Sequence, residues 1–199
     1  MGSKFYVGLV PWLVFAVANR SGAQGLALSA ALALLATLAV VVVSLQERRP
    51  TLLNGAAIVL FGTLGAAALV LDLAALDRLG RPLAAAGLAA IAWASLLAVP
   101  LVEPYTRDVV TPAESAARRF TQANRAVTSI WAWAFVDVTA SLLLGAVIAT
   151  PLAATVLNWL VPGALVLRAV ARSTARWRED FDPDDPAGGL SDLGDLLRG

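Results

Sequence analysis

Long apolar runs constrain this chain more than any other feature. A helix needs about 20 apolar residues to cross the roughly 30 Å hydrocarbon core of a bilayer. Five segments reach this length, at residues 26–45, 52–76, 83–102, 126–149 and 152–171. The sequence therefore predicts an all-α fold, a polytopic transmembrane helix bundle.

Composition supports this prediction. The chain of 199 residues is 59% hydrophobic and 15% charged, whereas a soluble domain is about 45–50% apolar and about 25% charged. Such a chain lacks the polar surface to cover its core in water, so its excess apolar surface is expected to face lipid. We place one transmembrane domain at residues 1–175 and an acidic, flexible cytoplasmic tail at residues 176–199.

The stretch Phe5–Ala18 has two interpretations. As a helix it covers roughly 21 Å, which is short for a span, and Pro11 interrupts it. Lys4, the apolar run and the small residues Ala16-Val17-Ala18 also resemble a signal peptide with its cleavage site. We favour a short or re-entrant first helix that the protein keeps, which brings the predicted number of spans to six.

Basic residues outside the spans predict the orientation. If six spans alternate between the two faces of the membrane, one face receives eleven Lys and Arg residues and the other receives three. The richer face holds Lys4, Arg48, Arg49, Arg107, Arg118, Arg119, Arg125, Arg168, Arg172, Arg176 and Arg178. Cytoplasmic loops carry an excess of such residues, so this face and the C-terminus are predicted to be cytoplasmic. We expect a multi-pass protein of a bacterial inner membrane.

Missing residue types exclude several kinds of chemistry. The chain has no Cys and no His, and Met1 is its only methionine. Thiol nucleophiles, Ser-His-Asp triads, zinc sites, iron–sulfur clusters and His- or Met-ligated haem are therefore excluded. The single lysine, Lys4, lies at the extreme N-terminus, which excludes a lysine Schiff base within the bundle. We expect no catalytic residues, no metal, no cofactor and no enzymatic activity.

Residues 103–125 form a predicted cytoplasmic segment between the fourth and fifth spans. The sequence Thr111-Pro112-Ala113-Glu114 has the pattern of a helix start, with a capping box and a proline at the first helical position. The predicted helix carries Arg118, Arg119 and Arg125 mostly away from its apolar face. These arginines either contact anionic lipid headgroups from a basic amphipathic helix or act as an ordinary positive-inside anchor.

One carboxylate lies in the middle of a predicted span. A charge at the bilayer centre costs about 2.5 to 3.5 kcal/mol on insertion scales, and Asp137 lies at the middle of the span at 126–149. Trp133 and Ser141 share its helix face at four-residue spacing, and Asn158 lies in the last span. Together they either line a proton or cation pathway, or Asp137 is a buried carboxylate that bonds to another helix, for example to Asn158.

Small residues recur at four-residue spacing within the spans. Gly62 is followed by Ala66, and Ser141 is followed by Gly145. Such spacing lets two helices approach closely. Spans this rich in alanine also produce it by chance, so both interpretations stay open.

Several short motifs resemble a known family. They are Pro11-Trp12-Leu13-Val14-Phe15, Phe61-Gly62-Thr63-Leu64, Pro104 with Arg107, and Asn124-Arg125 followed by Thr128, Trp131 and Phe135. Their order and spacing, over roughly residues 4–175, resemble the intracellular septation protein A family of bacterial inner-membrane proteins. The resemblance implies five or six helices, a role in cell-envelope biogenesis and septation, and partners in the elongation and division machinery. It implies no catalytic residues.

Two functions follow from these observations. The first is a non-enzymatic inner-membrane protein of envelope biogenesis and septation that acts through helix packing and contacts with membrane lipids or with envelope and division proteins. The alternative is a small proton- or cation-coupled transporter or lipid flippase that uses Asp137. A homodimer fits either function, and nucleic acid is not an expected partner.

Overall fold

A computed structural model describes residues 3–19, 25–46, 52–71, 74–107, 110, 118–148 and 150–180. All regular structure in these residues is helical. The helices are α1 (Ser3–Gly8), α2 (Val10–Ala18), α3 (Gly25–Gln46), α4 (Leu52–Leu71), α5 (Ala74–Ser95), α6 (Glu103–Thr106), α8 (Arg118–Val147), α9 (Pro151–Thr155), the π-helical segment η2 (Val156–Leu160) and α10 (Val161–Asp180).

Four of these helical stretches are long and apolar enough to cross a membrane. They are Gly25–Leu45, Leu52–Leu71, Arg118–Val147 and Pro151–Glu179, the last of which joins α9, η2 and α10 into one rod. Much of their surface is exposed and apolar, with Leu69, Val70 and Val147 each about four-fifths exposed. Large exposed apolar surfaces on a protein mark regions that contact lipid or another protein. The prediction of an all-helical fold with several apolar helices of membrane length is confirmed.

The boundary between the third and fourth predicted spans was placed wrongly. The predicted spans at 52–76 and 83–102 leave the polar residues 77–82 between them, yet α5 begins at Ala74 and ends at Ser95. A carboxylate in the first turn of a helix is stabilised by the helix dipole, and Asp77 is in that turn. The Asp77 Oδ1 atom also accepts a 2.8 Å hydrogen bond from the backbone nitrogen of Leu26 at the start of α3. This cross-helix contact, which hydropathy cannot report, holds the polar stretch in helical form.

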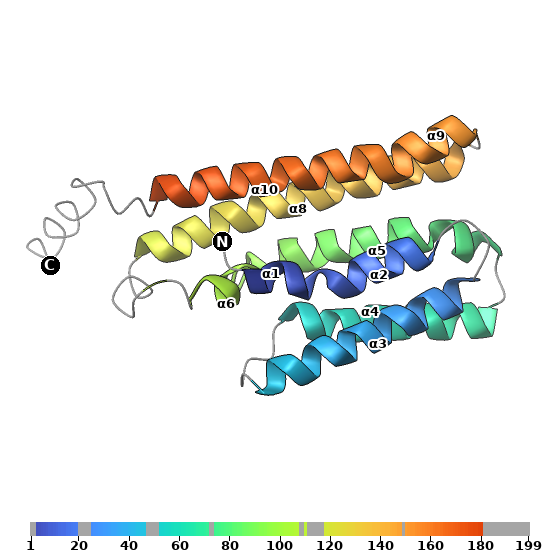
Figure 1. The fold of residues 1–199 in the computed structure, drawn as a ribbon, viewed down its shortest axis with the longest axis horizontal. Helices are drawn as coiled ribbons and strands as arrows, with labels where there is room; N and C mark the ends of the chain where they lie inside the picture. Colours follow the sequence, from blue (N-terminus) through green and yellow to red (C-terminus); the bar gives the residue numbers. More distant parts are fainter. Residues whose placement is uncertain are drawn as a thin grey trace, which may run out of the picture.

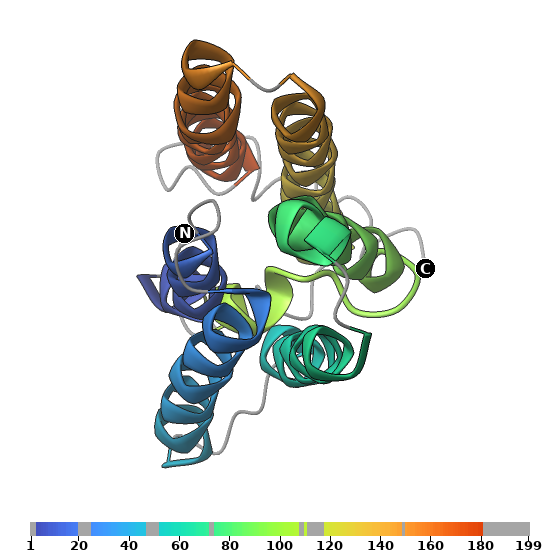
Figure 2. The same cartoon turned by 90° about the vertical axis from the view of Figure 1, so that its right-hand side faces the viewer.

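The helices run back and forth along one long axis (Figure 1). The segment α1–α2, then α3, α4, α5, α8 and the rod α9–α10 alternate in direction, so that α1 begins and α10 ends at the same end of the bundle. Viewed along the axis, α5 lies near the centre, with α8 and α10 on one side and α3 and α4 on the other (Figure 2). Helices α3 and α4 pack on each other, α8 packs on both α5 and α10, and α2 packs mainly on α3.

The short first segment is part of the core. Phe5, Trp12 and Phe15 are buried almost completely. The Phe5 ring meets that of Trp131 in α8 edge to face, with centroids 5.1 Å apart. The Trp12 and Phe15 rings lie 4.9 and 5.1 Å from that of Phe61 in α4. Aromatic contacts of this kind add about 0.5–1.5 kcal/mol each beyond area burial, so α1 and α2 connect the N-terminal helices to α8.

The basic segment between the fourth and fifth predicted spans runs straight into α8. The predicted cap at residues 111–114 lies outside the described residues, and the described helix begins at Arg118 and continues without a break to Val147. Arg118 and Arg125 are exposed, whereas Arg119 is half-buried. Two of the three predicted headgroup contacts therefore have the exposure that this role needs. Residues 181–199 of the predicted tail also lie outside the described residues.

The two pairs of small residues differ in the structure. Ser141 and Gly145 are both buried, and the Ser141 hydroxyl donates a 2.7 Å hydrogen bond to the Leu157 carbonyl across the α8–α9 hairpin. Gly62 is exposed, and a Cβ added there would meet nothing within 4 Å. Small residues at four-residue spacing therefore lie at a close helix contact in α8, whereas the pair with the same spacing in α4 lies on an exposed surface.

Candidate functional site: a cavity between α2, α5, α8 and α10

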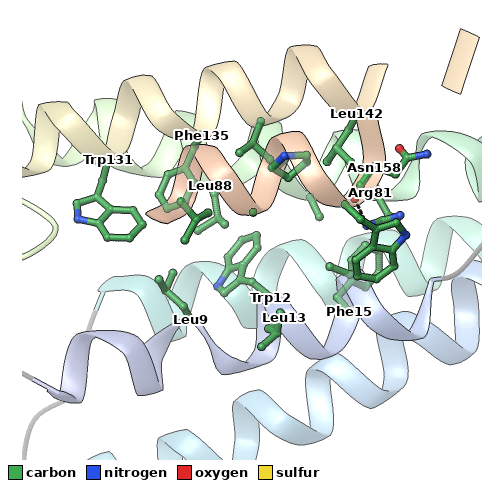
Figure 3. Close-up of a pocket in the computed structure, with 18 of the residues that line it drawn as sticks. Leu9, Trp12, Leu13, Phe15, Arg81, Leu88, Trp131, Phe135, Leu142 and Asn158 are labelled. Carbon is green, nitrogen blue, oxygen red and sulfur yellow. Dashed lines mark hydrogen bonds between the residues drawn. The ribbon is translucent and has the colours of Figure 1, made fainter. Parts of the chain in front are cut away.

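A cavity of about 570 Å³ lies between the N-terminal and C-terminal parts of the bundle (Figure 3). Its volume is within the range of small-molecule sites, about 300–1,000 Å³. Helices α2, α5, α8 and the rod η2–α10 supply most of its walls. Helix α10 packs on α8 and helix α2 packs on α3, so neither fills the space between them. The cavity is therefore the space that remains where the N-terminal and C-terminal parts of the bundle diverge.

Most of the cavity wall is aliphatic or aromatic. The apolar lining comprises Leu9, Val10, Trp12, Leu13, Phe15, Ala16, Ala84, Ala85, Leu88, Trp131, Phe135, Val138, Leu142, Trp159, Pro162, Val166 and Leu167. Small residues on α5, Ala84 and Ala85, leave room there, while aromatic rings from α2 and α8 form the opposing walls. Such a surface suits an aliphatic chain and disfavours a polar solute.

The cavity opens sideways between α2 and α10. Leu13 and Val10 on α2, and Leu167 on α10, line the cavity and are at the same time well exposed on the bundle surface. Exposed side chains that also line a cavity mark its mouth. In a bilayer this mouth faces the lipid chains, so a ligand can enter from the membrane without crossing a polar surface.

One end of the cavity is polar, because the last helix changes its winding there. In η2 the Val161 N–H donates to the Val156 carbonyl, five residues back, which widens the turn. In α-helical geometry the Asn158 carbonyl would pair with the nitrogen of residue 162, but Pro162 has no N–H. The Arg81 Nη2 atom donates to that carbonyl instead, at 2.8 Å. A π-type turn of this kind often marks a functional site.

Two contacts with the last helix help to hold the Arg81 guanidinium in place. Besides the bond to the Asn158 carbonyl, its Cζ atom lies 4.4 Å from the centroid of the Trp159 ring. A cation over a Trp face gains about 0.5–2 kcal/mol, more when it is desolvated, and Arg81 is half-buried. The charge is therefore fixed at one end of an otherwise apolar cavity, near Asn158 and Leu142 (Figure 3).

Two of the tryptophans that line the cavity, Trp12 and Trp131, have buried indole N–H groups. Trp12 and Trp131 are 6% and 0% exposed, and the Nε1 atom of each has no hydrogen-bond partner among the described residues. A buried donor without a partner costs about 1–3 kcal/mol.

The structure separates the four residues of the predicted ion pathway. Asp137 and Trp133 are exposed on the outer face of α8, where Trp133 pairs edge to face with Trp93, centroids 5.3 Å apart. Neither lines the cavity. Ser141 is buried against Leu157, and Asn158 alone of the four lines the cavity. The predicted bond between Asp137 and Asn158 is absent from the contacts of the described residues.

Arg81 was not among the site residues predicted from the sequence. The available signal was Pro162, which lies four residues after Asn158 and so leaves a carbonyl in the last span without its helical donor. Such a carbonyl requires a donor from another helix. The sequence offers several arginines, and only the packing of α5 beside η2 brings Arg81 to this one.

Comparison with family models, with curated proteins and with solved structures gives no match to this chain. The resemblance to the septation family stays a prediction. Among the described residues no group of three or more Asp or Glu side chains is placed to hold a metal ion.

Proposed function

We propose that this chain is a non-enzymatic, multi-pass membrane protein that binds a membrane lipid, or an amphiphile of similar shape, in the cavity between α2, α5, α8 and α10. The supporting observation is the cavity itself, about 570 Å³ with apolar walls and a lateral mouth. A water-soluble substrate would have to cross an apolar surface to enter it. A lipid enters from the phase that already surrounds the protein.

The proposed membrane topology follows from the distribution of the exposed arginines. Six segments alternate in direction along the bundle, with α1–α2 as a short first span. The exposed arginines of the segments near the end where α1 begins and α10 ends are Arg107, Arg118, Arg125, Arg172 and Arg176. By the positive-inside rule, that end faces the cytoplasm of a bacterial cell, and the Arg81 end of the cavity faces the outer leaflet of the inner membrane.

The resemblance to the septation family adds a cellular role to the proposal. A lipid-binding membrane protein of this kind would act in cell-envelope biogenesis and septation, together with envelope or division proteins. The residues that carry the resemblance include Trp12, Trp131 and Phe135, which line the cavity. This overlap supports placing lipid binding and the family role in the same site.

Filling the cavity tests the proposal. A Cβ added at Gly163 meets nothing within 4 Å, and Gly163 lines the cavity. Phenylalanine at this position therefore occupies ligand space without disturbing the backbone. We expect Gly163→Phe to lower lipid occupancy at least about fivefold after detergent exchange, because a clash of about 1–3 kcal/mol lowers the affinity by that factor or more. Native mass spectrometry of the purified protein measures the occupancy.

Gly62→Phe is the matched control. Gly62 is also an exposed helical glycine with open space around it, and it does not line the cavity. We expect wild-type lipid occupancy in this variant. Equal occupancy in the wild type and in Gly163→Phe would show that the bound lipid lies elsewhere, and would overturn the proposal.

The transporter alternative is tested at Asp137. Because Asp137 lies on the outer face of α8 and does not line the cavity, we expect Asp137→Asn to change lipid occupancy by less than about twofold, the usual limit for a surface substitution. The same variant in proteoliposomes with a pH-sensitive dye reports proton movement. A proton flux present in the wild type and lost in Asp137→Asn would favour coupled transport over lipid binding alone.

A further inference from the structure

Helix α8 has two long faces with different surroundings. One face lines the cavity through four residues at helical spacing, Trp131, Phe135, Val138 and Leu142. The opposite face is exposed and carries Trp133, Asp137, Ala140 and Leu144. Their spacing of four, three and four residues is the spacing at which one helix packs along another. The outer face of α8 therefore has the pattern of a contact surface, and it lies apart from the cavity.

Asp137 is poorly suited to contact with lipid. It lies at the middle of the span at 126–149. Its side chain is exposed and makes no hydrogen bond or ion pair with a described residue. Carboxylates at this depth almost always face the bundle interior or a water-filled cavity, or pair with another polar group. The cavity lies on the other face of α8, which leaves contact with another protein surface as the way to cover Asp137.

The same face carries a hydrogen-bond donor that suits a carboxylate. Trp133 lies one turn before Asp137, its side chain is 58% exposed, and its ring contacts that of Trp93 in α5 edge to face. Its indole nitrogen donates no hydrogen bond to a described residue. The face thus presents one donor and one acceptor about 6 Å apart along the helix axis. Ala140, and Ala90 on α5, are exposed on this surface, and small residues let a second helix approach closely.

A second copy of this chain supplies both groups at the matching depth. Copies of one protein insert in the same orientation, so a twofold axis along the membrane normal brings the same face of each copy together. We infer that the outer face of α8 binds a second copy of this chain about such an axis, with Asp137 of each copy accepting a hydrogen bond from the Trp133 indole of the other. Each contact then occurs twice, and both carboxylates are covered. The inference goes beyond the proposed lipid binding and does not depend on it.

Cysteine cross-linking of the full-length protein in membranes tests this interface. The chain has no cysteine, so Ala140→Cys and Leu144→Cys each carry a single thiol on the exposed face. A disulfide forms only where two Cα atoms come within about 7 Å of each other. We expect oxidation with copper phenanthroline to convert these variants to a covalent dimer on a non-reducing gel. If both variants stayed monomeric, the inference would be overturned.

Ala66→Cys is the matched control. Ala66 is an exposed alanine on α4, four residues after the exposed Gly62, and small residues at this spacing also support helix pairing. We expect this variant to stay monomeric under the same oxidation. A covalent dimer from Ala66→Cys with none from Ala140→Cys would place the interface on α4 and overturn the inference. Equal cross-linking of the two would mean random collision in the membrane and would also overturn it.

Two changes at Asp137, each made together with Ala140→Cys, test the chemistry of the contact. Asp137→Leu removes the acceptor and leaves a side chain that lipid accommodates. We expect it to lower the cross-linked fraction at least about tenfold, the factor that corresponds to loss of a hydrogen bond to a charged group. Asp137→Asn keeps an oxygen acceptor at the same position, so we expect it to retain the dimer. Undiminished cross-linking in the Asp137→Leu protein would contradict the proposed contact.

The wild-type protein gives a measurement that needs no substitution. Native mass spectrometry of the full-length protein released from lipid nanodiscs reports its oligomeric state. We expect a dimer as the main species, and a monomer at every ratio of protein to nanodisc would overturn the inference. Gly163→Phe enters the cavity on the other face of α8, so we expect it to keep the dimer. Loss of lipid without loss of the dimer in that variant would support two separate sites.

Discussion

Trp131→Ala is expected to lower the free energy of unfolding by about 3 kcal/mol, at the low end of the range for a buried aromatic residue. The Trp131 side chain is fully buried, and its ring contacts those of Phe5 and Phe135 at centroid distances of 5.1 and 5.6 Å. In a bilayer the unfolded helices are already surrounded by apolar chains, so the loss is one of packing and not of transfer from water. The alanine leaves a void that the neighbouring rings cannot close.

Trp133→Ala is the matched control on the same helix. The Trp133 side chain is 58% exposed, and its main aromatic contact is with Trp93. Loss of that pair costs about 1 kcal/mol. Titration with SDS at constant lipid, followed by circular dichroism, measures both variants. If Trp133→Ala destabilised the protein as much as Trp131→Ala does, the assignment of inner and outer faces of α8 would be wrong.

Gly145→Leu is expected to destabilise the protein by about 3 kcal/mol, the upper part of the range for overpacking. A Cβ added at Gly145 would lie 2.7 Å from the Asn158 Oδ1 atom and 3.1 Å from Asn158 Cγ. Real Cβ atoms do not approach this closely, so either Asn158 or the helix must move. Asn158 belongs to η2, and its backbone carbonyl accepts a hydrogen bond from Arg81. The substitution should therefore also reduce lipid occupancy.

Gly62→Leu separates this packing effect from the effect of losing a glycine. A Cβ at Gly62 meets nothing within 4 Å, and replacing an exposed helical glycine gains about 0.5–1 kcal/mol in backbone entropy. We expect this control to be neutral or slightly more stable than the wild type in the same SDS titration. A Gly145→Leu protein that unfolds like the wild type would mean that α8 and η2 do not meet at this position.

The apolar runs, read from the sequence, were sufficient to predict helices of membrane length. Their ends were harder to predict. The helix α5 begins at Ala74 and not near residue 83 because Asp77 bonds to the backbone of α3, and no local pattern contains that bond. In α8, by contrast, the basic segment continues into the span without a break, because both parts share one uninterrupted helical periodicity.

The candidate site was harder to predict than the helices. Polar residues within spans were the natural candidates, and the sequence pointed to Asp137 because charge in lipid is costly. Which way a side chain faces depends on the helices that surround it. The structure turns Asp137 outward and brings Arg81 inward beside Asn158. Hydropathy marks a residue as unusual, but the partner that it meets is a property of packing.

The sequence by itself determined that this chain forms apolar helices of membrane length, because the length of a run and its helical hydrogen bonds are local properties. It also determined, through Pro162, that a carbonyl in the last helix would lack its usual donor. Only the tertiary structure decided that α2 and α10 separate and leave a cavity, and that Arg81 closes one end of it. The physical reason is that a cavity is made by the misfit of surfaces from distant segments, and such a misfit is absent from each segment alone.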